Sequence, residues 1–241
     1  MNRSICLPLA TALALVACTS QPQPPTVNVV VVVDRTDRHL VATLAEDASE
    51  VIASFRLDED PWRGVDLRLA FVTDVGYNAV KELHLPAEEE ADGNILVRRQ
   101  HVRTFIEEVG ELLRSCAAKR SERDSSLVYI SLANELNLLA RSKADVRLMI
   151  AYTDLLERAP GLSLYDVPID SITLRSGSFI DHFERICPLE RLDGIGIAIA
   201  AVPKSAVNSE RITATYRLYE QMLTAKGALV FIGGNYVHHK Q

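Results

Sequence analysis

The sequence has little aromatic character, no excess of positive charge and few cysteines. Aromatic residues make up 6% of the 241 positions, which argues against a stacking platform for single-stranded nucleic acid. The formal net charge of −6 leaves no basic excess to neutralise phosphates, so we expect no nucleic-acid partner. Hydrophobic residues make up 48% of the chain, which is ample for the buried core of an α/β domain of this length.

The apolar stretch nearest the start of the chain, Ile5–Ala14, is too short to span a bilayer. With Arg3 before it, this stretch predicts a cleaved targeting segment over residues 1–17. The sequence Leu-Val-Ala before Cys18 resembles the bacterial lipobox, whose cysteine is lipidated and becomes the mature N-terminus. The resemblance implies acyl chains such as palmitate on Cys18 and anchoring in the bacterial cell envelope, with Thr19 favouring the outer membrane.

Residues 18–26 are rich in proline and glutamine, so we expect an extended tether there rather than a folded element. One folded domain is then predicted over residues 27–241. Within it, Cys116 and Cys187 are the remaining cysteines. In an oxidising compartment they could form a disulfide, and two inert thiols would fit the sequence equally well.

The run Val27–Val33 is the most apolar and most β-branched stretch of the mature chain. Because it lacks polar alternation, it predicts a strand that is covered on both faces, as in a central parallel strand. Strand and helix patterns then alternate from residue 27 to residue 232. This alternation predicts an α/β fold with a doubly wound, mostly parallel central sheet and helices on both faces, which is a Rossmann-like architecture.

The remaining elements are predicted from hydrophobic periodicity and from turn residues. We expect Ser125 or Ser126 to cap the helix that follows them. Residues 75–94 lack a regular pattern, and residues 95–98 could form a short strand. The expected strands are 65–73, 145–152, 194–202 and 228–232, and the expected helices are 39–55, 101–118, 127–141, 178–186 and 209–225, the last closed by Gly227.

Acidic residues follow three of the predicted strands, at Asp34, Asp74 and Asp154. In open parallel sheets, the binding and catalytic groups lie beyond the carboxyl ends of the strands. Thr36 and Asp37 follow the first of these strand ends closely. The sequence therefore predicts a functional site at this edge of the sheet.

Three short motifs at this edge resemble the von Willebrand factor A (vWA) fold. They are a first strand that ends in Asp34-x-Thr36, a later strand that ends in Tyr-Thr-Asp at Asp154, and the serines Ser125 and Ser126 before the helix between them. In that family such residues form a metal-ion-dependent adhesion site. The resemblance therefore implies that Asp34, Thr36, Ser125 or Ser126, and Asp154 bind Mg²⁺, a hard ion that prefers oxygen ligands.

One position departs from the family pattern, because Arg38 stands where the motif has a second serine. A guanidinium beside a divalent cation is unfavourable, so the site could be degenerate and hold no metal. Arg38 could instead pair with Asp34 or Asp154. We expect Arg38, Asp37 and Asp74 to contact a protein partner.

The resemblance implies a non-enzymatic function, in which a membrane-anchored envelope lipoprotein binds another protein. The sequence shows no obvious pairing of a nucleophile with a base. The alternative is a phosphohydrolase of the haloacid dehalogenase type that uses Asp34 as its nucleophile. The second acid of that motif is replaced by Thr36, and Asp37 comes one residue too late.

Overall fold

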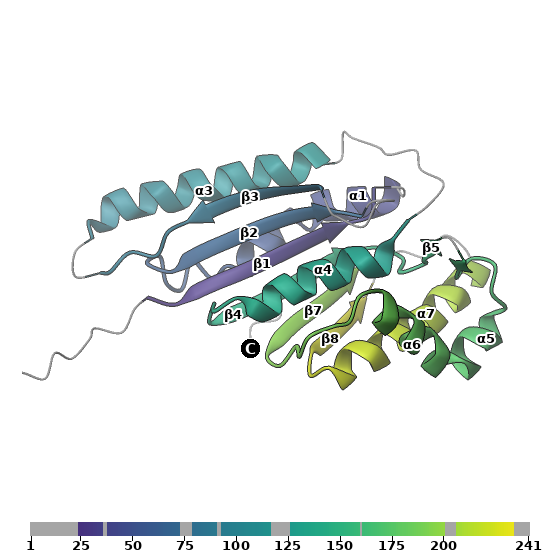
Figure 1. Ribbon diagram of the computed structural model, residues 1–241. Helices are drawn as coiled ribbons and strands as arrows, with labels where there is room; N and C mark the ends of the chain where they lie inside the picture. Colours follow the sequence, from purple (N-terminus) through teal and green to yellow (C-terminus); the bar gives the residue numbers. More distant parts are fainter. Residues whose placement is uncertain are drawn as a thin grey trace, which may run out of the picture.

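The computed structural model describes residues 24–35, 38–72, 79–90, 93–116, 126–159, 161–200 and 206–233. Six strands form the central sheet in the order β3-β2-β1-β4-β7-β8 (Figure 1). All neighbouring strands are parallel except β3, which runs antiparallel to β2. The strands are β1 (Thr26–Val33), β2 (Gly64–Phe71), β3 (Ala79–Leu85), β4 (Val146–Tyr152), β7 (Ile195–Ala200) and β8 (Leu229–Gly233), with a separate ribbon of β5 (Arg158–Ala159) and β6 (Leu162–Ser163).

Helices cover both faces of this sheet, which confirms the predicted fold class. One face carries α1 (Arg38–Glu46), α2 (Ala48–Ala53) and α3 (Ile95–Cys116). The other carries α4 (Val128–Arg141), α5 (Ile169–Leu174), α6 (Ser176–Ile186) and α7 (Ala206–Ala225). Among the described residues, no helix is both long and apolar enough to cross a bilayer.

Strand β1 lies between β2 and β4 and contributes to both hydrophobic cores. Val29, Val31 and Val33 pack under α1–α3, whereas Val30 and Val32 pack under α4–α7. Successive side chains of a strand point to opposite faces, so an unbroken valine run can supply two cores at once. The prediction of a strand covered on both faces is therefore confirmed.

Strand β3 lies within the stretch that was expected to be irregular. It is an edge strand, and its exposed side chains include Lys81, Glu82 and His84. Charged residues on an edge strand hinder pairing with other chains, and here they obscure the strand pattern in the sequence. Cross-strand ion pairs hold β3 to β2, including Glu82 with Arg68.

The expected short strand at residues 95–98 is wrong, because these residues form the first turn of α3. Asn94 caps this helix, and its Oδ1 accepts hydrogen bonds from the backbone N–H groups of Leu96 at 2.9 Å and Val97 at 3.4 Å. An asparagine directly before an apolar run is an N-cap signal that the strand interpretation overlooked.

The expected helix over residues 39–55 is two shorter helices that are separated by Asp47. Helix α5 was not expected from the sequence, and the other boundaries lie within a few residues of the expected ones. Gly227 follows α7 with a φ of +98°, the left-handed conformation that commonly ends a helix. Cys116 packs in the core under α1–α3, whereas Cys187 packs against the opposite core, so these two cysteines do not form a disulfide with each other.

Candidate functional site

The order of the strands reverses between β1 and β4, which are neighbours in the sheet. From β1 the chain builds outward through β2 and β3, and from β4 it builds the other way through β7 and β8. Doubly wound sheets bind their ligands outside the carboxyl ends of the strands at such a reversal. Asp34 follows β1 directly and Asp154 follows β4 by two residues, so both predicted acids stand at this point.

Asp34 is 3% exposed, and the contacts that hold it in place include two hydrogen bonds. Its backbone N–H donates to the carbonyl oxygen of Tyr152 at 2.9 Å, and its Oδ2 accepts a hydrogen bond from the Ser126 hydroxyl at 3.2 Å. Ser126 is positioned by two backbone hydrogen bonds with Arg158, at 3.0 and 3.1 Å. Two of the residues expected to share the site, Asp34 and Ser126, are therefore in direct contact.

This contact replaces the predicted helix cap. Leu127 is the residue before α4, and no side chain caps the helix from that position. Ser126 instead lies in a β-bridge with Arg158, which turns its hydroxyl toward Asp34.

The segment after β4 is a tight turn in which the side chains of Thr153 and Asp154 hold the backbone. Asp154 Oδ1 accepts a hydrogen bond from the Leu156 N–H at 2.9 Å, and Thr153 Oγ1 accepts one from the Leu155 N–H at 3.1 Å. Leu155 has a φ of 60°, a left-handed conformation that costs a leucine roughly 1–2 kcal/mol. Backbone strain of this kind is tolerated where surrounding contacts hold the chain, and it often accompanies functional sites.

Glu157 lies at the end of this turn and is 3% exposed. Its Oε2 accepts a hydrogen bond from the backbone N–H of Tyr129 at 2.8 Å, in the first turn of α4. Burial, aided by the negative charge of Asp34 and opposed by the N–H groups of Tyr129 and Val128, raises the pKa of Glu157 to about 7. A buried carboxyl at the start of a helix therefore titrates near neutral pH.

Tyr165 completes the group, because its hydroxyl donates to Asp154 Oδ2 at 3.2 Å. Burial raises the pKa of Tyr165, as do the charges of Asp154 and Asp34, so the phenol keeps its proton. We call Asp34, Ser126, Asp154, Glu157 and Tyr165 the switch-point cluster.

Two arginines accompany the switch-point cluster. The exposed Arg158 places its guanidinium 4.8 Å from the centre of the Tyr165 ring, and Arg35 places its own 4.1 Å from the centre of the Phe71 ring. Arginine over an aromatic face is an attractive arrangement. The site therefore has buried acidic side chains at its bottom. A partly exposed layer that contains arginine and tyrosine lies above them.

Sequence reasoning missed Glu157 and Tyr165. Glu157 could have been noticed as a second acid in the same loop as Asp154. Tyr165 had no such signal, since the β5–β6 ribbon and a hydrogen bond to Asp154 bring it to the cluster.

Several predicted site residues lie outside the described residues, namely Cys18, Thr36, Asp37, Asp74 and Ser125. Arg38 begins α1, but its side chain is likewise outside the description. Their predicted roles stay predictions.

Of the predicted magnesium ligands, the structure describes Asp34, Ser126 and Asp154. Both carboxylate oxygens of Asp154 accept hydrogen bonds from protein groups, Leu156 and Tyr165. Within the part of the chain that the structure describes, no group of three or more His, Cys, Asp or Glu side chains is placed to hold a metal ion. The family pattern would need Thr36 and Ser125 to complete the ligand set.

Comparison with protein-family models and with curated protein sequences finds no match to this chain. Among solved structures, the chain is similar to the pilus adhesin SpaC from Lactobacillus rhamnosus GG, in an open conformation and in a second crystal form. Sequence identity is 11% in both, and the TM-scores are 0.37 and 0.41. The match covers 89% of this chain but only 28% and 29% of the two adhesin chains.

Proposed function

We propose that this chain is a lipid-anchored envelope protein whose vWA-like domain binds another protein through the switch-point cluster. The observation that carries the proposal is the position of Asp34. Its carboxylate is buried at the reversal of strand order and is hydrogen-bonded by Ser126 from a separate loop. Segments from three parts of the chain thus converge on one point, as expected for a binding site on a doubly wound sheet.

The exposed part of the cluster suits a protein partner. Arg158 is exposed and Tyr165 is 36% exposed, with the rest of its side chain buried. Tyrosine and arginine are enriched among the residues that dominate binding energy at protein interfaces. The contacts beneath them, from Asp34, Asp154 and Ser126, hold the loops in place before a partner arrives. A preorganised surface loses less conformational entropy on binding.

The proposed binding does not require a divalent cation. The support for this is that Asp154, one of the expected ligands, is already held in place by a hydrogen bond from Leu156 to Oδ1 and one from Tyr165 to Oδ2. Arg38 in place of a serine agrees with such a metal-independent version of the adhesion site.

Capture of proteins from a solubilised cell envelope tests the proposed binding. We expect the wild-type chain to retain a partner, and Asp34→Asn to retain at least about tenfold less, since loss of a residue important for an interface costs upwards of about 1–2 kcal/mol. Asp145→Asn is the matched control, because Asp145 is an exposed acid at the opposite end of β4.

Each capture is run with Mg²⁺ and with a chelator. Equal retention in both conditions supports metal-independent binding, whereas retention only with Mg²⁺ would restore the full adhesion site. Equal retention by wild type and Asp34→Asn would refute a role for the cluster.

The proposed anchor rests on the resemblance of the segment before Cys18 to a lipobox. In bacteria fed a labelled fatty acid, we expect the wild-type chain to incorporate label and to sediment with membranes. Cys18→Ser should lose the label entirely, because the thiol is the site of acylation. Soluble, unlabelled wild-type protein would rule the anchor out.

A further inference from the structure

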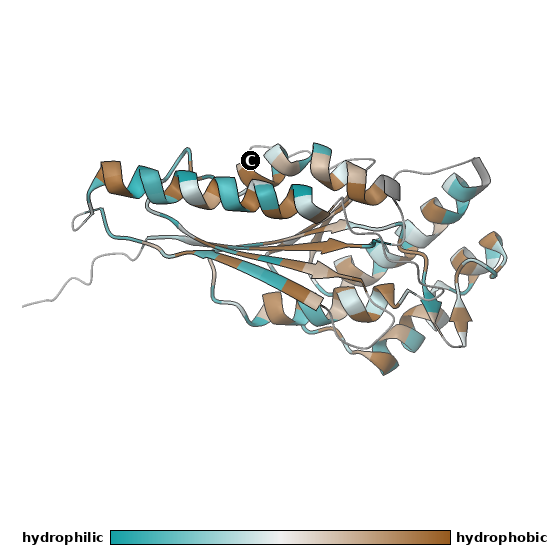
Figure 2. Cartoon of the chain, turned by 90° about the horizontal axis from the view of Figure 1, so that it is seen from above, coloured by the Kyte–Doolittle hydropathy of each residue, from teal (hydrophilic) through white to brown (hydrophobic). Residues whose placement is uncertain are grey.

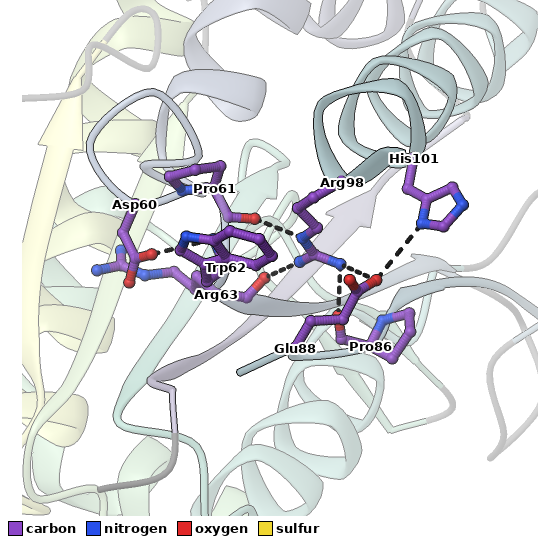
Figure 3. A network of polar contacts seen from close by, with 8 residues as sticks. All are labelled: Asp60, Pro61, Trp62, Arg63, Pro86, Glu88, Arg98 and His101. Atoms are coloured by element: carbon purple, nitrogen blue, oxygen red, sulfur yellow. Dashed lines mark hydrogen bonds and ion pairs between the residues drawn. The ribbon is translucent and has the colours of Figure 1, made fainter. Parts of the chain in front are cut away.

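The end of the domain at which β1 begins is held together by one buried arginine. Arg98 is 0% exposed, and its guanidinium donates to the carbonyl oxygens of Pro61 at 2.6 Å, Arg63 at 2.7 Å and Pro86 at 2.9 Å (Figure 3). It also donates to Glu88 Oε1 at 3.0 Å. One side chain of α3 thus ties together the two loops that flank β2 and β3 at this end.

The same loops adjoin the point where the chain enters the domain. The Gly64 N–H donates to the carbonyl oxygen of Pro25 at 3.1 Å, one residue before β1 begins at Thr26. Because Arg98 binds Arg63, the neighbour of Gly64, the start of α3 is fixed close to the start of β1. Figure 1 shows the two at the same end of the molecule.

Three consecutive apolar residues are exposed in this first turn of α3. Leu96 is 71% exposed, Val97 46% and Ile95 37%. Figure 2 shows the turn as a hydrophobic tip at the end of an otherwise mixed helix. A contiguous apolar surface of this kind commonly marks a contact site, whereas isolated apolar residues do not.

The backbone of the tip is prepared for a less polar environment. Asn94 accepts hydrogen bonds from the N–H groups of Leu96 and Val97, which would otherwise lack partners at a helix start. The nearest charge along the helix, Arg98, is turned inward and bonded to Glu88. The apolar tip can therefore leave water while these polar groups keep their hydrogen bonds.

We propose that the apolar tip, Ile95–Val97, inserts into the interface of the bilayer that carries the lipid anchor. This inference rests on the proposed acylation of Cys18. Thr26 comes eight positions after Cys18, so the start of β1 lies within roughly 28 Å of the anchored residue. The tether is therefore short enough to keep the tip near the membrane surface.

The geometry also sets the direction in which the domain faces. β1 has eight residues and spans about 26 Å, and the switch-point cluster lies at its far end. With the apolar tip in the bilayer, the cluster points away from the membrane, toward a partner in the adjoining compartment.

The attraction is apolar and not electrostatic. The exposed acids Glu89 and Glu90 lie close to the tip in sequence and would be repelled by anionic lipids, and the exposed Arg99 offsets only one of these two charges. Three side chains bind weakly alone, but the anchor supplies a high local concentration of membrane. We therefore expect insertion into zwitterionic lipid that is insensitive to salt.

Depth-dependent fluorescence quenching tests the tip. The acylated full-length chain is reconstituted in phosphatidylcholine vesicles with or without brominated acyl chains. Wild type, whose single tryptophan is Trp62, gives the baseline for two variants, Leu96→Trp and Leu174→Trp. Leu174 is the matched control, because it is 84% exposed and lies on α5, away from the start of β1.

We expect brominated lipid to remove more than about half of the emission added by Leu96→Trp, since interfacial side chains sit roughly 5–10 Å into the acyl boundary. Emission added by Leu174→Trp should stay unquenched, and raised salt should change neither result. If both variants are quenched equally, or if neither is quenched, insertion of the tip is rejected. In an acylated sample, this result leaves the proposed lipid anchor in place.

Two further outcomes are informative. Blue-shifted but unquenched emission from Leu96→Trp would mean that protein covers the tip, which also overturns the proposal. Mass spectrometry of the same sample reports on Cys18, and absence of acyl chains would overturn the anchor and the tip together.

Discussion

Replacing Arg98 by alanine is expected to lower the free energy of unfolding by about 3–5 kcal/mol, the usual cost of removing one partner of a buried charged network. The substitution removes a fully buried side chain and leaves the carbonyl oxygens of Pro61, Arg63 and Pro86 without their donor. Each acceptor that loses its partner adds to the cost. Urea denaturation followed by circular dichroism measures the change.

The neighbouring Arg99 provides the matched control. It occupies the next position of α3 and is exposed, so Arg99→Ala should change the free energy of unfolding by no more than about 0.5 kcal/mol. Arg98→Lys should fall between the two, because an ammonium group cannot reproduce the planar fork that serves four acceptors. Equal stability of Arg98→Ala and Arg99→Ala would contradict the structural role of this network.

Replacing Glu157 by glutamine is expected to stabilise the protein at pH 8 and to have little effect at pH 5. The folded state raises the pKa of Glu157 from 4.5 to about 7, so between these values the folded chain holds a proton that the unfolded chain has lost. The free energy of unfolding therefore falls as the pH rises through this window. Above pH 7, the whole contribution of the Glu157 proton to stability is lost. At 1.36 kcal/mol per pKa unit, the total is about 3 kcal/mol.

Glutamine removes the charge but keeps a carbonyl oxygen that can accept the N–H of Tyr129. Urea denaturation at several pH values between 5 and 8 should show a flatter pH dependence for Glu157→Gln than for wild type. Glu89→Gln, at an exposed acid remote from the cluster, should leave the wild-type dependence in place. Parallel curves for wild type and Glu157→Gln would show that Glu157 does not titrate in this window.

The architecture was predictable because its strongest signals are local. The valine run of β1 can bury its side chains only between two apolar layers. The apolar strands β4 and β7 carry the same signal. β3 and the start of α3 were not predicted, for opposite reasons. β3 is stabilised by pairing with β2 rather than by its own pattern, and the apolar residues at the start of α3 resembled a short strand although they are exposed.

The site was predictable only as far as strand ends could be placed. Asp34 and Asp154 follow from the alternation of elements, since carboxyl ends of parallel strands share one edge of the sheet. The contact of Ser126 with Asp34 depends on a bridge to Arg158, which is a tertiary feature. Glu157 acquires its raised pKa from burial beneath α4, and no local sequence pattern reports burial of that kind.

The central position of β1 has a mechanical consequence. This strand is in parallel register with eight residues of β2 and seven of β4, from its start at Thr26 to its end next to Asp34. A pull that enters at Thr26 and is resisted at the opposite end runs along the strand, across the direction of its hydrogen bonds. Both ladders would then be loaded in shear, with many bonds sharing the force at once. A domain strung between a tether and a distant partner would be strongest along this axis.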